Sequence, residues 1–234
     1  MAQPITLLER DFLAYERYRQ DDPEYNALRL SVRRKLAALI EPVKKLAKER
    51  GVDLKAQGGL HHPYSFNSFR VREQRAYLCR SDKERKALGS FFGDALGKDA
   101  ETHYIQTVLE LSLDDQVVEA ALRIHPQAWW DGQNFKKKCA TQDGHRECLT
   151  ALNALPKGFV LLMHDWKKEY VCGALPSDQL DEYVDTYTPG NHWLHLRRLL
   201  RRDQALALGN GIEGWVIESL LALLPVYSFI LWRP

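Results

Sequence analysis

The sequence predicts a single α+β domain, residues 1–234, in which helices pack on a mainly antiparallel sheet. Three observations support this fold class: a helical apolar stripe in residues 23–50, a β-hairpin pattern in residues 103–126, and an apolar helix around Pro225. The chain has no internal repeat and no linker long enough to divide it. One core of two packed layers is therefore expected.

Two helices are expected at the N-terminus. Residues 5–20 combine apolar positions with good helix formers. The second helix begins after Asp22, a typical N-cap residue, with Pro23 at the first helical position. Its apolar residues recur at spacings of three and four, and Gly51 ends it. These apolar residues are Leu28, Val32, Leu36, Leu39, Val43 and Leu46.

The middle of the chain predicts the sheet. Residues 55–64 indicate a loop, and residues 64–72 an extended strand with a return strand at 75–80. Asp82 begins a short helix. Residues 103–113 and 116–126 then alternate across an Asp-Asp turn, which is the strongest hairpin signal in the chain.

The remaining elements are mainly helical. Residues 128–153 predict helices interrupted near residue 142, and residues 158–175 predict a second hairpin. Ser177 begins a helix that runs to Tyr187, and the final 40 residues are expected to be mainly helical. Residues 215–232 are apolar, but a glutamate and a proline interrupt them, so we expect no membrane span.

The composition is that of a folded soluble protein, with 45% hydrophobic and 27% charged residues. Residues 1–98 carry 20 basic and 13 acidic side chains, whereas residues 99–125 carry one basic and six acidic side chains. The basic half predicts a possible anionic partner. The pI near 8.3 is nevertheless far below that of a dedicated nucleic-acid binder.

The cysteines and the N-terminal residues favour a cytoplasmic protein. Cys79, Cys139, Cys148 and Cys172 form no tight disulfide framework in a chain of this size. The N-terminal stretch lacks both a positive leader and an apolar core, so we expect no secretory signal.

The arginine-rich stretch at residues 65–86 contains the first candidate site. Arginine presents planar donors that suit phosphate or carboxylate, and two on one strand face can hold one anion. The predicted anion-binding residues are Arg70, Arg72, Arg75, His62 and Asn67. The alternative is a solvated sheet whose arginines pair with acids such as Glu110 or Glu119.

A second candidate site lies at residues 125–139. Trp129 and Trp130 are expected to stack a base or a sugar, while Lys136 and Lys137 bind phosphate. The alternative is an amphipathic helix that is anchored on the sheet and has lysines on its solvated face.

Metal and cofactor sites are not expected. Cys139, His145 and Cys148, or His192 and His195, provide only two or three ligands each, and a closed zinc site needs four. The motifs of nucleotide loops, nucleophile elbows and zinc proteases are absent from the sequence.

The stretch from residue 70 to 86 resembles an uncharacterised bacterial family, the domain-of-unknown-function 2461 proteins. Arg72, Glu73 and Arg75 match that family's Arg-acid-x-Arg element, and Asp82 with Lys83 matches a following Asp-Lys pair. The order of the elements is also similar. This resemblance implies a fold and no particular reaction.

Two functions are predicted from these observations. The first is a soluble binding protein whose basic N-terminal half docks on nucleic acid or on an acidic protein. The alternative is an enzyme with an Arg/His anion pocket for a phosphorylated or carboxylated small molecule. The apolar C-terminus also predicts a possible oligomer.

Overall fold

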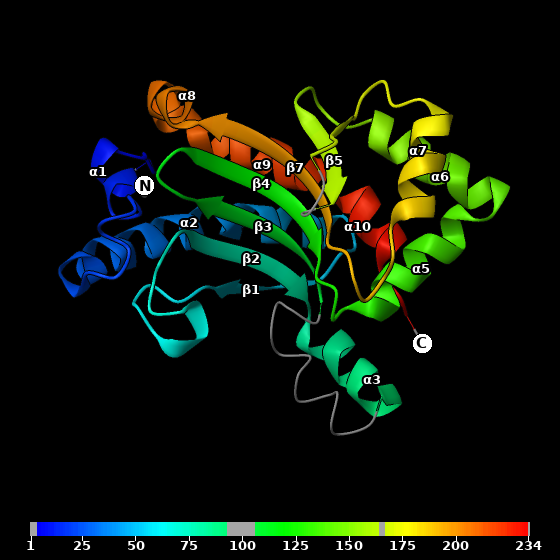
Figure 1. The fold of residues 1–234 in the computed structure, drawn as a ribbon, viewed down its shortest axis with the longest axis horizontal. Helices are drawn as coiled ribbons and strands as arrows, with labels where there is room; N and C mark the ends of the chain where they lie inside the picture. The colour runs from blue at the N-terminus through cyan, green and yellow to red at the C-terminus, as the bar shows by residue number, and fades with distance from the viewer. Residues whose placement is uncertain (1–3, 93–105, 164–166, 234) are drawn as a thin grey trace.

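The computed structural model describes residues 4–92, 106–163 and 167–233, except for the side chains of residues 89–92. These residues form one seven-stranded antiparallel sheet in the order β1-β2-β3-β4-β7-β5-β6. Figure 1 shows the strands crossing the centre of the molecule. The strands are β1 (Leu54–Gly58), β2 (Gln74–Arg80), β3 (Thr107–Leu113), β4 (Val117–Ile124), β5 (Phe159–Met163), β6 (Tyr170–Val171) and β7 (Leu194–Arg201).

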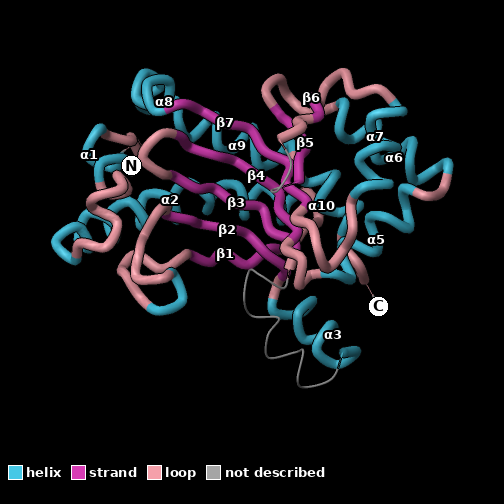
Figure 2. The backbone as a smooth tube through the Cα atoms, viewed as in Figure 1, coloured by secondary structure: helices cyan, strands magenta, loops and turns pink. Residues whose placement is uncertain are grey.

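The described helices pack on one face and at the ends of this sheet, which confirms the predicted α+β class. Figure 2 shows α5, α6 and α7 gathered at one end of the strands. The helices are α1 (Glu9–Leu13), α2 (Asn26–Glu49), α3 (Asp82–Phe92), α5 (Trp129–Cys139), α6 (Gln142–Asn153), α7 (Ser177–Thr186), α8 (Arg202–Leu208), α9 (Ile212–Ala222) and α10 (Leu224–Ile230). Short 3-10 turns cover Pro23–Tyr25, Ser65–Asn67 and Gly209–Gly211.

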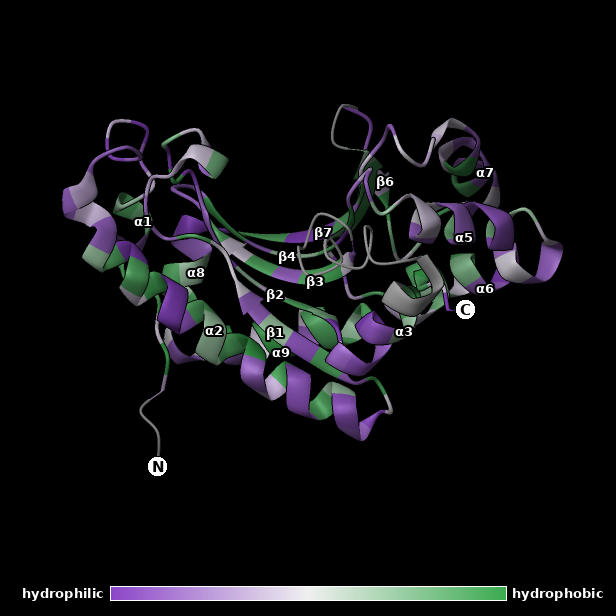
Figure 3. Cartoon of the chain, turned by 90° about the horizontal axis from the view of Figure 1, so that it is seen from below, coloured by the Kyte–Doolittle hydropathy of each residue, from purple (hydrophilic) through white to green (hydrophobic). Residues whose placement is uncertain are grey.

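The two faces of the sheet differ in character. In Figure 3, α2 and α9 lie under the curved sheet, and no described helix crosses its opposite, concave face. The covered face carries a row of directly paired leucines on five neighbouring strands: Leu78, Leu109, Leu122, Leu196 and Leu161. All five are buried. Burial of this row against α2, α9 and α10 is the main hydrophobic contribution of the sheet.

The second predicted helix forms as expected. The Asp22 carboxylate accepts a hydrogen bond from the Glu24 backbone N–H at 2.9 Å, which caps the 3-10 turn that leads into α2. Val32, Leu36 and Val43 of the apolar stripe are completely buried. Their burial fixes α2 across β1 and β2. Arg34, Lys45 and Lys48 on its other face are exposed, whereas Arg29 is completely buried.

The apolar C-terminal segment is a core element. The helical run Arg202–Ile230 is long and apolar enough to cross a membrane by length and composition alone, yet 56% of its most apolar window is buried inside the chain. Val216, Leu220, Tyr227 and Ile230 are completely buried. The apolar residues that predicted an oligomer are thus mostly covered by the chain itself.

A buried ion pair joins the sheet to the helices at its end. Arg80, the last residue of β2, donates two hydrogen bonds to the Asp131 carboxylate of α5, at 2.9 and 2.6 Å. The side-chain exposures are 1% and 0%. The carboxylate also accepts hydrogen bonds from the Thr107 hydroxyl at 2.7 Å and from the Trp232 backbone N–H at 2.8 Å. Four segments that are distant in sequence therefore meet at one carboxylate.

Several predicted elements differ from the structure. Residues 64–72 are not a strand, because a 3-10 turn and left-handed residues at Ser68 and Phe69 prevent an extended chain. The partner of β2 is instead β1, in a stretch predicted as a loop. Of the predicted helix 5–20, only Glu9–Leu13 is α-helical.

The strand β7 was not predicted at all. Its sequence, LHLRRLLR, is rich in helix formers, but it pairs with β4 on one side and β5 on the other. Two neighbouring strands therefore override the local helical preference. The described parts of both predicted hairpins are confirmed, as are the α5–α6 break and α7, while residues 93–105 and 164–166 lie outside the described residues.

We expect Asp131→Ala to destabilise the protein by about 3–5 kcal/mol, because it leaves the Arg80 guanidinium buried without a counter-charge. The measurement is the free energy of unfolding in urea. The control is Asp143→Ala, whose carboxylate is 88% exposed and pairs only with Arg146. Equal stabilities of the two variants would contradict this role for the ion pair.

Candidate functional site

The arginine-rich stretch leads into a closed loop, residues 59–73, whose two ends meet on the sheet. The Gly59 backbone N–H donates to the Arg75 carbonyl at 2.9 Å. The Gln74 side-chain amide donates to the Gly59 carbonyl at 3.2 Å. Loops closed in this way are compact and frequently functional. We call this segment the 59–73 loop.

Hydrogen bonds inside the 59–73 loop hold its backbone in one conformation. The Asn67 side chain accepts from the Tyr64 backbone N–H at 2.7 Å and donates to the His62 carbonyl at 2.9 Å. Ser68 and Phe69 have φ angles of 54° and 57°, which are unfavourable for residues with a side chain. Asn67, predicted to bind an anion, thus holds the loop together.

The tip of the 59–73 loop exposes an unusual amount of apolar surface. The exposed fractions are 85% for Phe66, 63% for Phe69, 49% for Tyr64 and 43% for Leu60. Four large apolar residues within ten positions form more than scattered surface hydrophobics. Such a cluster is characteristic of a contact surface.

Arginines flank this apolar tip. Arg70 and Arg72 are exposed, and neither guanidinium pairs with a carboxylate within the described parts of the chain. Arg33 of α2 adjoins the start of the loop: its Nε lies 3.0 Å from where a Cβ on Gly58 would sit. The pKa of His61 is lowered, first by burial and then by the charges of nearby groups that include Arg33 and Arg34.

We call Arg33, Arg34, Arg70 and Arg72 the loop arginines. Like Arg70 and Arg72, Arg33 and Arg34 of α2 form no ion pair with another described residue. His62, predicted with the anion-binding set, is half-buried, and its ring makes edge contacts with those of His61 and Tyr64. Rings and cations therefore share one surface.

Arg75 lies apart from this surface. It points to the concave face of the sheet from β2, where its guanidinium pairs with Glu73 and approaches Glu110 at 3.6 Å. The structure therefore does not gather Arg70, Arg72 and Arg75 on one strand face. For Arg75, pairing with Glu110 is the arrangement that the alternative prediction described.

The concave face carries a buried ion network across β3 and β4. Arg123 lies between two carboxylates, at 3.1 Å from Glu110 and 2.5 Å from Glu119. The Glu110 and Glu119 side chains are only 1% and 8% exposed. The register places these residues on one face because Glu119 and Arg123 are four positions apart on β4.

The network continues onto β7 and to Glu169, which directly precedes β6. The His195 Nε2 lies 2.9 Å from the Glu119 carboxylate, which fixes the ring in place. Arg197 approaches the same carboxylate at 3.7 Å and donates to Glu169 at 2.8 Å. Each arginine of this face thus has acidic partners within the molecule.

The charges of the network determine how its groups titrate. Burial raises the pKa of the Glu119 carboxyl, but the hydrogen bonds and charges of His195 and Arg123 outweigh burial and hold that pKa well below its usual value. Burial lowers the pKa of Arg123, and Glu110 with Glu119 more than reverses this effect. Glu119 and Arg123 therefore stay charged at neutral pH.

The second predicted cluster is divided by the structure. Trp129 is 48% exposed, whereas Trp130 is 4% exposed, and their rings meet edge to face. The Lys136 ammonium donates to the Tyr187 carbonyl at 2.8 Å and so caps the end of α7. Trp129 and Lys137 remain at the surface. The four residues do not form one site.

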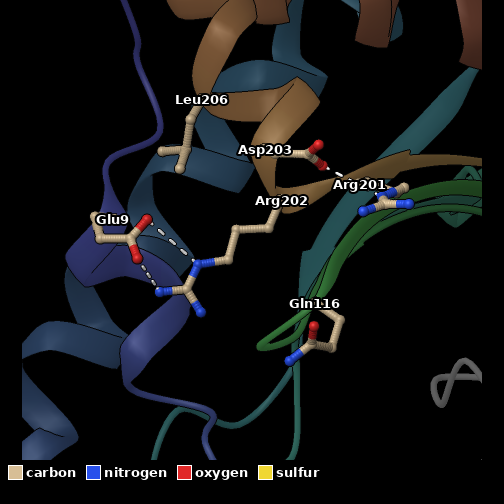
Figure 4. Close-up of a pocket in the computed structure, with 6 residues that line it drawn as sticks. All are labelled: Glu9, Gln116, Arg201, Arg202, Asp203 and Leu206. Carbon is tan, nitrogen blue, oxygen red and sulfur yellow. Dashed lines mark hydrogen bonds and ion pairs between the residues drawn. The ribbon is translucent and has the colours of Figure 1, made fainter.

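A cleft of about 360 Å³ lies between α1, the β3–β4 turn and α8. Figure 4 shows the Arg202 guanidinium pointing across it to Glu9. Arg202 also donates to the Asp115 carbonyl at 3.2 Å. Because this cation is already partnered, the contact attaches α1 to the sheet and does not indicate a ligand. The cleft is lined by Glu9, Gln116, Arg201, Arg202, Asp203 and Leu206.

The described residues that were considered for metal binding do not form a metal site. Among the residues that the structure describes, no group of three or more His, Cys, Asp or Glu side chains could hold a metal ion. The His145 Nε2 lies 3.0 Å from Asp181, and His195 is held by Glu119. The four cysteines are buried and free.

Comparison with known proteins adds no relative. No family model matches the chain, and no curated protein matches it. The resemblance to the domain-of-unknown-function 2461 proteins therefore stays a prediction.

Sequence reasoning did not identify Arg123 or His195 as network residues. The contact of His195 with Glu119 depends on β7 lying beside β4, and β7 was predicted as helix. The available signal was the alternation in residues 107–124, which places Glu110, Glu119 and Arg123 on one face. That pattern alone places three charged residues on one face, and it does not show which strand lies beside β4.

We expect Glu119→Gln to destabilise the protein by roughly 3 kcal/mol at pH 7, because a buried pairing charge is lost. The folded pKa of Glu119 lies below its ordinary value of 4.5, so its stabilisation is present above pH 4.5 and is lost as the pH falls below it. Urea unfolding from pH 7 to pH 3 should show the difference between variant and wild type narrowing below about pH 4.5.

The control for this experiment is Glu41→Gln, whose carboxylate is 55% exposed and pairs with Lys44. It should change stability little at any pH. A Glu119→Gln difference that stays constant down to pH 3 would show that the ion network contributes nothing through the charge of Glu119.

Proposed function

We propose that this protein is a binding module whose loop arginines dock on an anionic partner, either nucleic acid or an acidic protein. The observation that carries the proposal is that some arginines have acidic partners within the described chain and others do not. The loop arginines have no acidic partners in the described chain, and Arg34, Arg70 and Arg72 among them are exposed. Arg75, Arg123 and Arg197 are instead paired internally. Only the first group has charge available for a partner.

The surface around these cations supports docking by a macromolecule. The loop arginines come from two segments, α2 and the 59–73 loop. Arg33 lies against Gly58 at the start of the loop, and the apolar tip directly precedes Arg70. Contact surfaces commonly combine arginine with aromatic residues. The internal hydrogen bonds of the loop lower the ordering cost of binding.

The proposal treats the protein as soluble and cytoplasmic, without a metal or cofactor. The buried, unpaired cysteines support this part of it, because thiols persist in a reducing compartment. An oligomer formed through the C-terminus has little support, because the apolar side chains of α9 and α10 are mostly buried within the chain.

An enzyme remains the second candidate, and the His195–Glu119 contact favours it. A histidine oriented by a buried carboxylate is an arrangement found in general-base catalysis. On this proposal the anion pocket would use Arg197 and His195 of the concave face in place of Arg70 and Arg72. Nuclear magnetic resonance titration with inorganic phosphate tests it: an unchanged His195 ring resonance at millimolar phosphate would remove this candidate.

We expect Arg70→Ala with Arg72→Ala to weaken binding to single-stranded oligonucleotide or to polyglutamate. Each phosphate contact adds about 0.7 to the slope of log affinity against log salt, so four contacts predict a slope near −3 and a loss of about 50-fold between 50 and 200 mM salt. The double variant should lower the slope by about 1.4. Fluorescence anisotropy measures both quantities.

The matched control is Arg146→Ala with Arg201→Ala, which removes the same charge from side chains that are 72% and 76% exposed elsewhere. This control should leave the slope nearly unchanged. Equal effects of the two double variants would show that binding depends on net charge alone and not on the 59–73 loop.

A further inference from the structure

We propose that the 59–73 loop binds single-stranded nucleic acid by stacking bases on its exposed rings. This inference rests on the proposed function, because it assumes docking through the loop arginines and names the partner. It adds a second recognition element, the apolar tip, which charge alone leaves unexplained. The rings in question are those of Tyr64, Phe66 and Phe69.

The exposure of these rings suits stacking. Phe66 is 85% exposed, so most of its surface is open to solvent. The Tyr64 and Phe66 ring centroids are 5.7 Å apart with an interplanar angle of 34°, so the two rings do not cover each other face to face. Unstacked bases present flat apolar faces of the same kind, and aromatic side chains are the usual platform for them.

The backbone holds the rings in place before a partner arrives. The Phe69 N–H donates to the Tyr64 carbonyl at 2.8 Å, and the Ser68 N–H donates to the Ser65 carbonyl at 3.1 Å. Phe69 nevertheless occupies a left-handed conformation that disfavours side chains. A large apolar residue at an exposed position of this kind is unfavourable for the isolated protein, and such costs cluster at functional segments.

The cations are placed to accompany stacked bases. Arg70 follows Phe69 directly, and Arg72 lies two positions further on. Both are exposed. Arginine binds phosphate oxygens bidentately and also stacks on bases, so a strand whose bases lie on the rings can place its phosphates against these guanidiniums. The four cations of this surface are all arginines, and none of them is a lysine.

Two other anionic partners fit the surface less well. A flat anionic bilayer would also meet residues 16–24, which the Val71 N–H to Gln20 carbonyl hydrogen bond of 2.8 Å places beside the loop. That segment carries four acidic side chains against Arg17 and Arg19, so its net charge of −2 repels anionic headgroups. The carboxylates of an acidic protein would pair with the arginines, but they offer no flat apolar faces to the three exposed rings. A narrow single strand of nucleic acid contacts both the arginines, through its phosphates, and the exposed rings, through its bases.

The test compares two strands of equal charge. One is an oligothymidylate of about twelve nucleotides, within the usual site sizes of single-strand binders, and the other is an abasic strand of the same length. We expect wild-type protein to bind the base-bearing strand at least tenfold more tightly. Phe66→Ala should reduce that affinity about tenfold, while leaving affinity for the abasic strand and the salt slope unchanged.

A second variant and a control separate stacking from folding. Phe69→Gly removes a ring where the backbone favours glycine, so the variant should remain at least as stable as wild type while binding the oligothymidylate less tightly. Trp129→Ala removes an exposed ring outside the loop and should leave binding unchanged. Thermal unfolding of all three variants verifies that they are folded.

The outcomes distinguish this inference from the proposed function. Equal affinity for both strands, unaffected by Phe66→Ala, would overturn stacking while docking through the arginines stands. Binding to polyglutamate but to neither strand would overturn it in favour of an acidic protein. Phe66-dependent binding to phosphatidylserine vesicles, with neither strand bound, would overturn it in favour of a bilayer. If no anionic probe binds, the proposed function itself fails.

Discussion

The fold depends on one buried carboxylate. Asp131 of α5 receives the Arg80 guanidinium at the end of β2, the Thr107 hydroxyl at the start of β3, and the Trp232 backbone N–H after α10. Burying such a pair is costly unless its hydrogen bonds are satisfied. Here the two charged side chains and their hydrogen-bond partners come from four segments. The sheet end, α5 and the C-terminal segment must therefore assemble together for the buried charges to be tolerated. This constraint couples local helix formation to the global topology.

Local patterns predicted much of this fold. The α2 stripe, the β3–β4 hairpin and the α5–α6 break follow from apolar periodicity and caps, which are properties of neighbouring residues. The errors occurred where distant contacts decide the structure. The β7 strand forms from helix-favouring residues because β4 and β5 provide partners on both sides, and residues 64–72 form a loop because Asn67 and two left-handed residues close it.

The location of the candidate site was predictable from the sequence, but the separation of Arg75 from Arg70 and Arg72 was not. The sequence pointed to Arg70, Arg72 and Arg75 together, and spacing alone could not show that the loop ends between them. The structure places Arg75 in an internally paired network with Glu110, while Arg70 and Arg72 remain outward beside exposed rings. Phe66 and Phe69 were assigned to a strand, so their exposure could not be inferred. Only the closed loop geometry shows it.

The closure of the 59–73 loop has a consequence for how such a protein can diverge. The Gly59 backbone N–H, just after β1, donates to the Arg75 carbonyl of β2, and this hydrogen bond holds the two ends of the loop together. Insertions or replacements between these points leave the pairing of β1 with β2 unaltered. Natural variants can thus acquire new partners by exchanging the exposed tip of this segment, as long as Val71, which is buried in the core, is kept. A fold arranged in this way separates selection for recognition from selection for folding.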